Sequence, residues 1–189
     1  SVVAYRTAYL KYYYPKEFMA AQISSFMDRP KQIALYVEEC KRLGIKVLSP
    51  HINKSFKKFT VEKDSIRFGL SAVKNVGVNF IDAIVEARKS GEFISMTDFV
   101  RRVIKINSNA INKRALESLI KSGAFDCFKG NRAQYMAVYE KIIDLITGIK
   151  KNNVEGQFSM FKASSDEDNL PRLKDFSQSM KLEMEKEIL

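Results

Sequence analysis

The chain has 189 residues, of which 46% are hydrophobic, so it is long enough to form one domain or two small ones with a real core. Its 32 Lys and Arg residues outnumber its 22 Asp and Glu residues, and the net charge of +10 indicates a polyanionic partner, with nucleic acid ahead of an acidic membrane surface. No segment is apolar enough to span a bilayer, and the first residues lack the order of a signal peptide. Cys40 and Cys127 have no metal-ligand spacing, which favours reduced thiols in the cytoplasm.

The N-terminal part is expected to be helical, and because it opens mid-pattern without Met it is expected to be a piece of a longer protein. Apolar spacing predicts a helix over 1–13, and the prolines at the next two breaks predict helices over 15–27 and 30–43. Gly44 is the expected C-cap of the third. Four clustered tyrosines are interpreted as an aromatic core with hydroxyls at the solvent, in preference to a base-stacking platform: Tyr9, Tyr12, Tyr13 and Tyr14.

A small amount of β-structure is predicted next. Residues 45–48 are β-branched and bounded by Gly44 and Pro50, which indicates a strand, and residues 59–62 and 65–68 are typical of a hairpin with a short polar turn. Residues 54–58 form a basic loop before this hairpin. The loop is either simply solvated or, because the hairpin leads into the next motif, a DNA contact.

The stretch 69–88 carries the most informative pattern in the chain. Its apolar residues have helical spacing on both sides of a break at residues 74–78, which predicts a helix, a tight turn and a second helix. Gly77 takes positive φ freely, and Asn75 tolerates it next best. The turn should present backbone N–H groups at the start of a helix near Asn79, an arrangement that suits a phosphate. The pattern resembles a helix-hairpin-helix DNA-binding motif, with an ordinary αα-hairpin as the alternative.

The same arrangement returns in degenerate form further along. Thr97 is the expected N-cap of a helix over 98–104, a second helix opens at 112–114, and Asn131 is the expected N-cap of a helix to about 149. Residues 121–126 form the Gly-containing turn between the last two helices. Two such hairpins pack as one helical unit across a duplex groove, so the repeat favours DNA binding over a plain hairpin.

The composition becomes polar and aperiodic from Lys150, which predicts a flexible linker over 150–176. An apolar island inside it has a spacing that resembles the short peptide by which bacterial proteins bind the sliding clamp: Gln157, Phe158, Ser159, Met160 and Phe161. Residues 177–189 are amphipathic and are expected to start a following helix or domain.

Five collinear stretches resemble the bacterial C-family replicative DNA polymerases, the DNA polymerase III alpha subunits: AYRTAYLKYYYPKEFMAA, ECKRLGIKVLSPHINKS, IRFGLSAVKNVG with IDAIVEAR, NKRALESLIKSGAFD, and QFSMF. The resemblance implies that 1–53 ends the fingers domain, that 54–149 is a tandem helix-hairpin-helix domain and that 157–161 is the clamp-binding motif. It also implies a parent DNA-directed DNA polymerase whose Mg²⁺ ligands lie upstream of this chain, which itself needs no cofactor and should be inactive alone.

The sequence therefore predicts a mainly α fragment that binds duplex DNA non-specifically through its phosphates. Its expected partners are primer–template DNA, the sliding clamp and other subunits of the polymerase III holoenzyme, and not a membrane. The alternatives are a free-standing helix-hairpin-helix protein of DNA repair and a purely structural connector. Asn75 stands where many such motifs carry Gly, which should weaken phosphate contact there. The candidate DNA-binding residues are Lys74, Asn75, Val76, Gly77, Val78, Asn79, Lys113, Arg114, Lys121, Ser122, Gly123, Ala124, Lys129 and Arg132.

Overall fold

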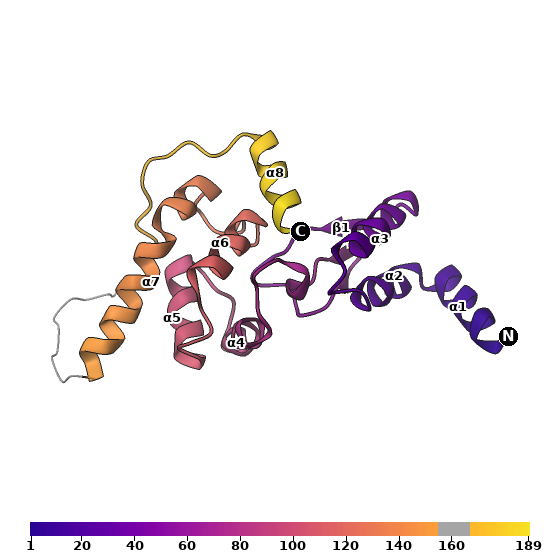
Figure 1. Ribbon diagram of the computed structural model, residues 1–189, viewed down its shortest axis with the longest axis horizontal. Helices are drawn as coiled ribbons and strands as arrows, with labels where there is room; N and C mark the ends of the chain where they lie inside the picture. The colour runs from indigo at the N-terminus through magenta and orange to yellow at the C-terminus, as the bar shows by residue number, and fades with distance from the viewer. Residues whose placement is uncertain (155–166) are drawn as a thin grey trace.

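The computed structural model describes residues 1–154 and 167–189, with side chains described for 1–148 and 167–189. The described chain is mainly α-helical with one small sheet, as the sequence predicts, and it is elongated, with α1 at one end and α7 at the other (Figure 1). In chain order the elements are α1 (Val2–Tyr13), α2 (Pro15–Ser24), α3 (Pro30–Arg42), β1 (Lys46–Leu48), β2 (Thr60–Glu62), β3 (Ser65–Arg67), the 3₁₀ turn η1 (Leu70–Ala72), α4 (Val78–Arg88), α5 (Met96–Ile106), α6 (Lys113–Lys121), α7 (Arg132–Val154) and α8 (Gln178–Ile188).

Most helix ends follow the local signals in the sequence. Pro15 and Pro30 occupy the first turns of α2 and α3, where the missing N–H costs no intrahelical bond. Gly44 follows α3 with a φ of 73°, and Asn112 caps α6 by accepting a hydrogen bond from Ala115 N. Within the described residues no helix is both long and apolar enough to cross a membrane.

One predicted cap is wrong. Ser95, and not Thr97, caps α5, because the Ser95 hydroxyl accepts a hydrogen bond from Asp98 N at 3.0 Å. Thr97 lies inside the first turn, where its hydroxyl donates to Asp168 Oδ1 at 2.8 Å. Both residues are good caps by type, and the helix begins at the earlier one.

The sheet has the strand order β1-β3-β2. β2 and β3 form the predicted antiparallel hairpin, and Lys63 in its turn takes a φ of 55°. β1 pairs with β3 in parallel, with Lys46 opposite Ser65. This parallel pairing joins the two sides of the boundary expected at Asn53, so that boundary falls inside one packed unit.

The tyrosine cluster of α1 is not part of a core, contrary to the preferred interpretation. No residue of α1 is buried, and its tyrosines are between 44% and 79% exposed. Tyr9 and Tyr13 contact each other along the helix, with ring centroids 4.5 Å apart. The helix projects from the end of the molecule (Figure 1).

An aromatic core joins the two hairpins. Phe99 of α5 lies edge-on to Phe93 and Phe125, with centroids 5.0 and 5.1 Å apart, and 6.1 Å from Phe80 of α4. Edge-to-face contacts of this kind contribute beyond the area they bury. Both hairpins are therefore built on one shared core rather than on two.

The predicted linker start at Lys150 is wrong, because α7 continues to Val154, whereas residues 167–176 of the expected linker are docked on this core. Leu170 is partly buried beside Gly130, and the side chains of Asn131 and Gln134 donate to the carbonyls of Leu173 and Pro171, at 3.0 and 2.8 Å. α8 follows and lies beside α6 (Figure 1). The helix predicted over 177–189 is confirmed, with Ser177 as its N-cap.

Candidate nucleic-acid interface

The first hairpin turn differs in detail from its prediction. The element before the turn is the single 3₁₀ turn η1 and not an α-helix. Asn75 takes the positive φ of 65°, whereas Gly77 has a φ of −77° and a ψ of 159°, which any residue adopts. Asn75 also donates from Nδ2 to Ser118 Oγ of α6 at 2.9 Å, so its side chain joins the two hairpins.

The start of α4 presents backbone N–H groups to the solvent. Gly77 is its N-cap, and the first amides that bond back along the helix are those of Phe80 and Ile81, each 3.1 Å from the Gly77 carbonyl. The amides of Val78 and Asn79 come before these bonds, and both residues are exposed. Free N–H groups at the positive end of a helix are the arrangement that binds phosphate.

The glycine at this helix start is not required by the fold. A Cβ built on Gly77 meets nothing within 4 Å, and its φ is ordinary. Gly69 is different, because a Cβ there would lie 2.6 Å from the Lys58 carbonyl carbon, so that glycine lets two backbone segments cross. The effect of Gly77 is to keep the approach to the amides of α4 unobstructed.

The basic loop is held beside this hairpin by backbone bonds. Leu70 N donates to Phe56 O at 2.8 Å and Ser71 N donates to Lys57 O at 3.1 Å. Lys57 and Lys58 are exposed, and neither has an ion pair among the described residues. These bonds hold the backbone of the basic loop beside η1 and leave both lysine side chains in the solvent.

Lys74 turns away from that site. Its backbone N–H donates to Ile188 O at 3.0 Å, and its ammonium donates to Glu187 O, so the lysine caps the C-terminus of α8. Val76, also a predicted contact, is buried and packs in the core.

The second hairpin turn does not offer the predicted amides. Ser122, Gly123 and Ala124 donate their N–H groups to Ser118, Ile120 and Leu119 at 3.0 to 3.1 Å. With Gly123 at a φ of 83°, these bonds form a Schellman motif that closes α6. The glycine ends a helix here, and the amides expected to capture phosphate are already satisfied.

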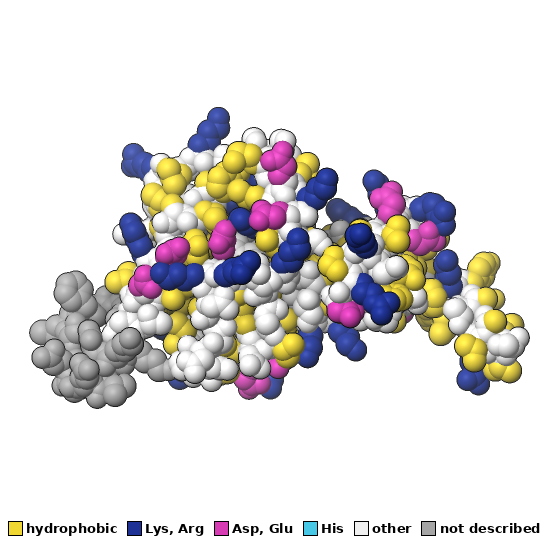
Figure 2. All heavy atoms as spheres, in the orientation of Figure 1, with side chains coloured by type: hydrophobic (Ala, Val, Ile, Leu, Met, Phe, Trp, Pro, Cys, Tyr) yellow, Lys and Arg dark blue, Asp and Glu magenta, His cyan; other side chains and the backbone are white. Residues whose placement is uncertain are grey.

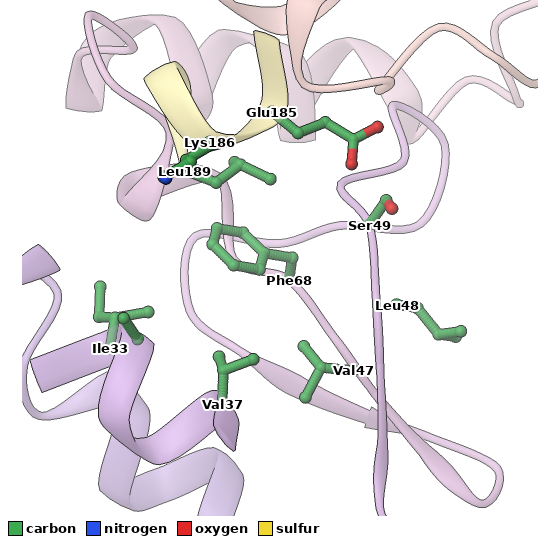
Figure 3. Close-up of a pocket in the computed structure, with 10 residues that line it drawn as sticks. Ile33, Val37, Val47, Leu48, Ser49, Phe68, Glu185, Lys186 and Leu189 are labelled. Atoms are coloured by element: carbon green, nitrogen blue, oxygen red, sulfur yellow. The ribbon is translucent and has the colours of Figure 1, made fainter. Parts of the chain in front are cut away.

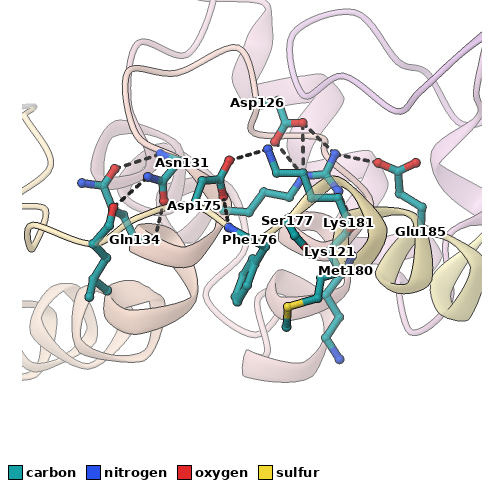
Figure 4. A network of polar contacts seen from close by, with 12 residues as sticks. Lys121, Asp126, Asn131, Gln134, Asp175, Phe176, Ser177, Met180, Lys181 and Glu185 are labelled. Carbon is teal, nitrogen blue, oxygen red and sulfur yellow. Dashed lines mark hydrogen bonds and ion pairs between the residues drawn. The ribbon is translucent and has the colours of Figure 1, made fainter.

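Arg132 has a structural position as well. It is only 5% exposed, and its Nη2 lies 2.7 Å from both Asp126 Oδ2 and Glu185 Oε1, while Nη1 donates to Lys121 O at 3.1 Å. Figure 4 shows this network between the second turn and α8. The arginine joins α8 to the hairpin and does not face the solvent.

The remaining predicted cations fall into two groups. Lys121 pairs with Glu117 at 3.0 Å and Glu187 at 3.5 Å, and the hydrogen bond with Glu117 is the largest cause of its raised pKa. Lys113 pairs with two acids of α7, Glu140 and Asp144. Arg114 and Lys129 are exposed and have no ion pair within the described residues. Figure 2 accordingly shows acidic and basic side chains mixed over α7 and α8, rather than one basic face.

The sequence analysis misses the polar contacts of residues 167–176. Asp168 accepts hydrogen bonds from Met96 N and Thr97 N at 2.9 and 2.8 Å, so its carboxylate occupies the start of α5. Asn131, the predicted N-cap of the helix that starts at Arg132, exchanges hydrogen bonds of 2.9 Å with Gln134. In each bond the backbone N–H of one residue donates to the side-chain oxygen of the other. The clamp-peptide residues 157–161 lie outside the described residues.

Comparison with known proteins agrees with this arrangement of hairpins. A family model described as a helix-hairpin-helix motif matches residues 44–135. The chain is 44% identical over 167 residues to the DNA polymerase III subunit alpha of Saccharopolyspora erythraea, which covers 88% of this chain and 14% of that protein. The same subunit from Borreliella burgdorferi and from Thermus aquaticus is 40% identical over the whole of this chain. The chain spans between 14% and 17% of the length of these relatives.

Proposed function

Because the chain is similar over most of its length to one segment of DNA polymerase III alpha subunits, we propose that it is the duplex-holding part of a DNA-directed DNA polymerase. The proposed parent enzyme is a nucleotidyltransferase of bacterial chromosomal replication, located in the cytoplasm and working with other holoenzyme subunits. The carboxylates that hold its Mg²⁺ are assigned to a part of the parent outside this chain. The chain alone is expected to bind DNA and to catalyse nothing.

The exposed start of α4 is the observation that supports this proposal. The amides of Val78 and Asn79, the positive helix end and the open approach at Gly77 together fit one phosphate. Lys57 and Lys58 supply charge for a neighbouring phosphate. Arg114 and Lys129 of the second hairpin are proposed as further phosphate contacts, because both side chains are exposed.

The proposed contacts carry no sequence information. Backbone amides and solvated lysines bind phosphate oxygens and are not placed to read base edges, so unrelated duplexes should bind within tenfold of one another. Each phosphate neutralised contributes about −0.9 to the slope of log K against log salt. Affinity should therefore depend strongly on salt and weakly on sequence.

Gly77→Asp gives a sharp test, because its effects on folding and on binding have opposite signs. Aspartate is a good N-cap, the backbone there is extended and a Cβ meets nothing within 4 Å, so the variant should be as stable as the wild type or more stable by about 0.5 kcal/mol. The same carboxylate would occupy the proposed phosphate position. We expect the affinity for a labelled duplex, measured by fluorescence anisotropy, to fall about tenfold and the salt slope to become shallower by about 1.

Ser1→Asp is the matched control. It also adds one negative charge at a helix N-cap, since Ser1 caps α1, but it lies at the far end of the molecule (Figure 1). It should leave duplex binding nearly unchanged. If both variants bind as the wild type does, the start of α4 is not the phosphate site.

We also assign residues 157–161 to sliding-clamp binding, on the resemblance of the peptide alone. A tether to the clamp would raise the effective concentration of the polymerase at the primer end without new DNA contacts. Replacing Gln157, Met160 and Phe161 with Ala should abolish clamp binding in surface plasmon resonance and spare duplex binding. Retained clamp binding would refute the assignment.

A structural connector is the second candidate function, and the closed second turn favours it. Its amides donate hydrogen bonds within the Schellman motif, and Arg132 is buried in its contact with α8. If the chain fails to bind any duplex at low salt, the connector is the better description.

A further inference from the structure

The last carbonyls of α8 bind a cation of the first hairpin, Lys74. Lys74 donates both its backbone N–H and its ammonium to the last carbonyls of α8, those of Ile188 and Glu187. The two carbonyl oxygens accept the hydrogen bonds that the oxygens of an anion would otherwise accept from this lysine. Lys74 is exposed, so the departure of α8 would leave its ammonium in the solvent.

The acidic side chains of the same segment bind other positive groups of the domain. The Asp168 carboxylate accepts hydrogen bonds from two backbone amides and the Thr97 hydroxyl at the start of α5. Glu185 binds Arg132 at 2.7 Å, and Glu187 lies 3.5 Å from Lys121. Amides at helix starts, lysines and arginines are also the groups with which proteins hold nucleic-acid phosphates.

Apolar packing contributes little to the hold of α8, a helix of eleven residues, on the domain. Ile188 is its one fully buried side chain, whereas α6 buries five. A cavity of about 300 Å³ lies beneath the end of α8. Apolar side chains of α3 and β1 and the ring of Phe68, which follows β3, form most of its lining, and Leu189 lies at its edge (Figure 3). With one buried side chain above an incompletely filled cavity, α8 is held mainly by its polar contacts with Arg132, Lys74 and Lys121, which a competing anion can replace.

We propose that residues 167–189 act as an internal phosphate mimic, so that docking of this segment and binding of duplex DNA oppose each other. With the segment docked, the duplex contacts the start of α4 and the basic loop only. When α8 leaves, Lys74 loses its partners on α8 and Lys121 keeps its ion pair with Glu117, so the duplex gains one or two cationic contacts. The inference rests on the proposed DNA binding, and the coupling must work in both directions.

The reciprocal effect can be measured in the wild-type chain. Hydrogen exchange of the α8 amides, and of the Lys74 amide that bonds to Ile188 O, should become faster when a saturating duplex is added. Unchanged or slower exchange in these amides, with the duplex bound, would overturn the inference. This experiment does not depend on any variant.

Ile188→Ser tests the same coupling without a change of charge. It removes the buried anchor, so α8 should lose its exchange protection, and the affinity for duplex in 50 mM salt should rise about tenfold with a slope steeper by about 1 to 2. Leu182→Ser is the matched control, because Leu182 is on the same helix and is 56% exposed. It should change neither protection nor binding.

The outcomes separate the inference from the function on which it rests. If Ile188→Ser releases α8 and binds duplex with the wild-type affinity and slope, the mimic is refuted while DNA binding stands. If neither protein binds duplex at low salt, the proposed function is refuted and this inference with it.

Discussion

Replacing Arg132 with methionine removes the cation that joins α8 to the second hairpin. Its residue type and place in the sequence predict a DNA contact, whereas in the structure the nearly buried guanidinium pairs with Asp126 and Glu185. Methionine fills the same aliphatic volume without a charge, so the variant isolates the polar contacts from the packing.

The expected cost follows from what is left behind. Removing one partner of a buried ion pair typically costs about 3 to 5 kcal/mol, because the remaining charge stays unpaired. Here the Asp126 side chain is 47% exposed and that of Glu185 is 24% exposed, so both regain part of their hydration and the cost should fall to about 3 kcal/mol or slightly less. Lys121 O also loses a donor, which contributes about 1 kcal/mol within that total.

Urea unfolding, followed by circular dichroism, measures this cost from the change in midpoint at constant slope. Arg114→Met is the control, because Arg114 is exposed and should lose less than about 0.5 kcal/mol. Adding Glu185→Gln to Arg132→Met removes an unpaired carboxylate, so the double variant should be more stable than the sum of the two single changes predicts, by about 1 kcal/mol. Wild-type stability of Arg132→Met together with a loss of duplex affinity would refute the clasp and restore the arginine to the DNA surface.

Gly123→Ala should destabilise the fold by about 2 to 3 kcal/mol, since its φ of 83° disfavours a side chain and the new Cβ would meet Arg132 and Asp126. Gly44→Ala is the control, because Gly44 has a φ of 73° and a Cβ there would meet nothing within 4 Å. It should cost only about 1 kcal/mol in the same urea assay. Equal costs would show that the steric part is absent. Hydrogen bonding to Arg67 is the largest cause that lowers the pKa of Glu62 to about 2, from a usual value near 4.5, so the pair should contribute up to about 3 kcal/mol that is present above pH 4.5 and lost as the pH falls towards 2. Acid titration of Glu62→Gln should accordingly show a shallower loss of stability over that window than the wild type, and identical curves would contradict the assigned pKa.

The sequence predicted the elements well where a local signal decides them. Prolines at the first turns of α2 and α3, Gly44 after α3 and Asn112 before α6 each act within one or two turns of the chain, so their effects can be derived from spacing alone. The choice between Ser95 and Thr97 could not be made in this way, because both are good caps and the packing of α5 decides between them.

The wrong predictions concern contacts that are distant along the chain. Glycine after a helix is compatible with exposed amides that bind phosphate and with a Schellman motif that closes the helix. The bonds from the Gly123 and Ala124 amides back to α6 show the second, and Arg132 lies against Gly123. The spacing of the tyrosines in α1 does not show whether another element packs against them. Residues 167–176 are polar and resemble a linker by composition, yet their docking depends on a carboxylate meeting a helix start about seventy residues away, as Asp168 does with Thr97.

The asparagine in the first turn has a mechanical consequence. Glycine would adopt the same left-handed backbone, but it has no side chain to span the gap between Asn75 and Ser118. The amide makes one hydrogen bond, 2.9 Å long, between the turn before α4 and α6. A force applied at the start of α4, where we propose that a phosphate binds, would therefore reach α6 through this bond and the rest of the helical unit through the shared aromatic core.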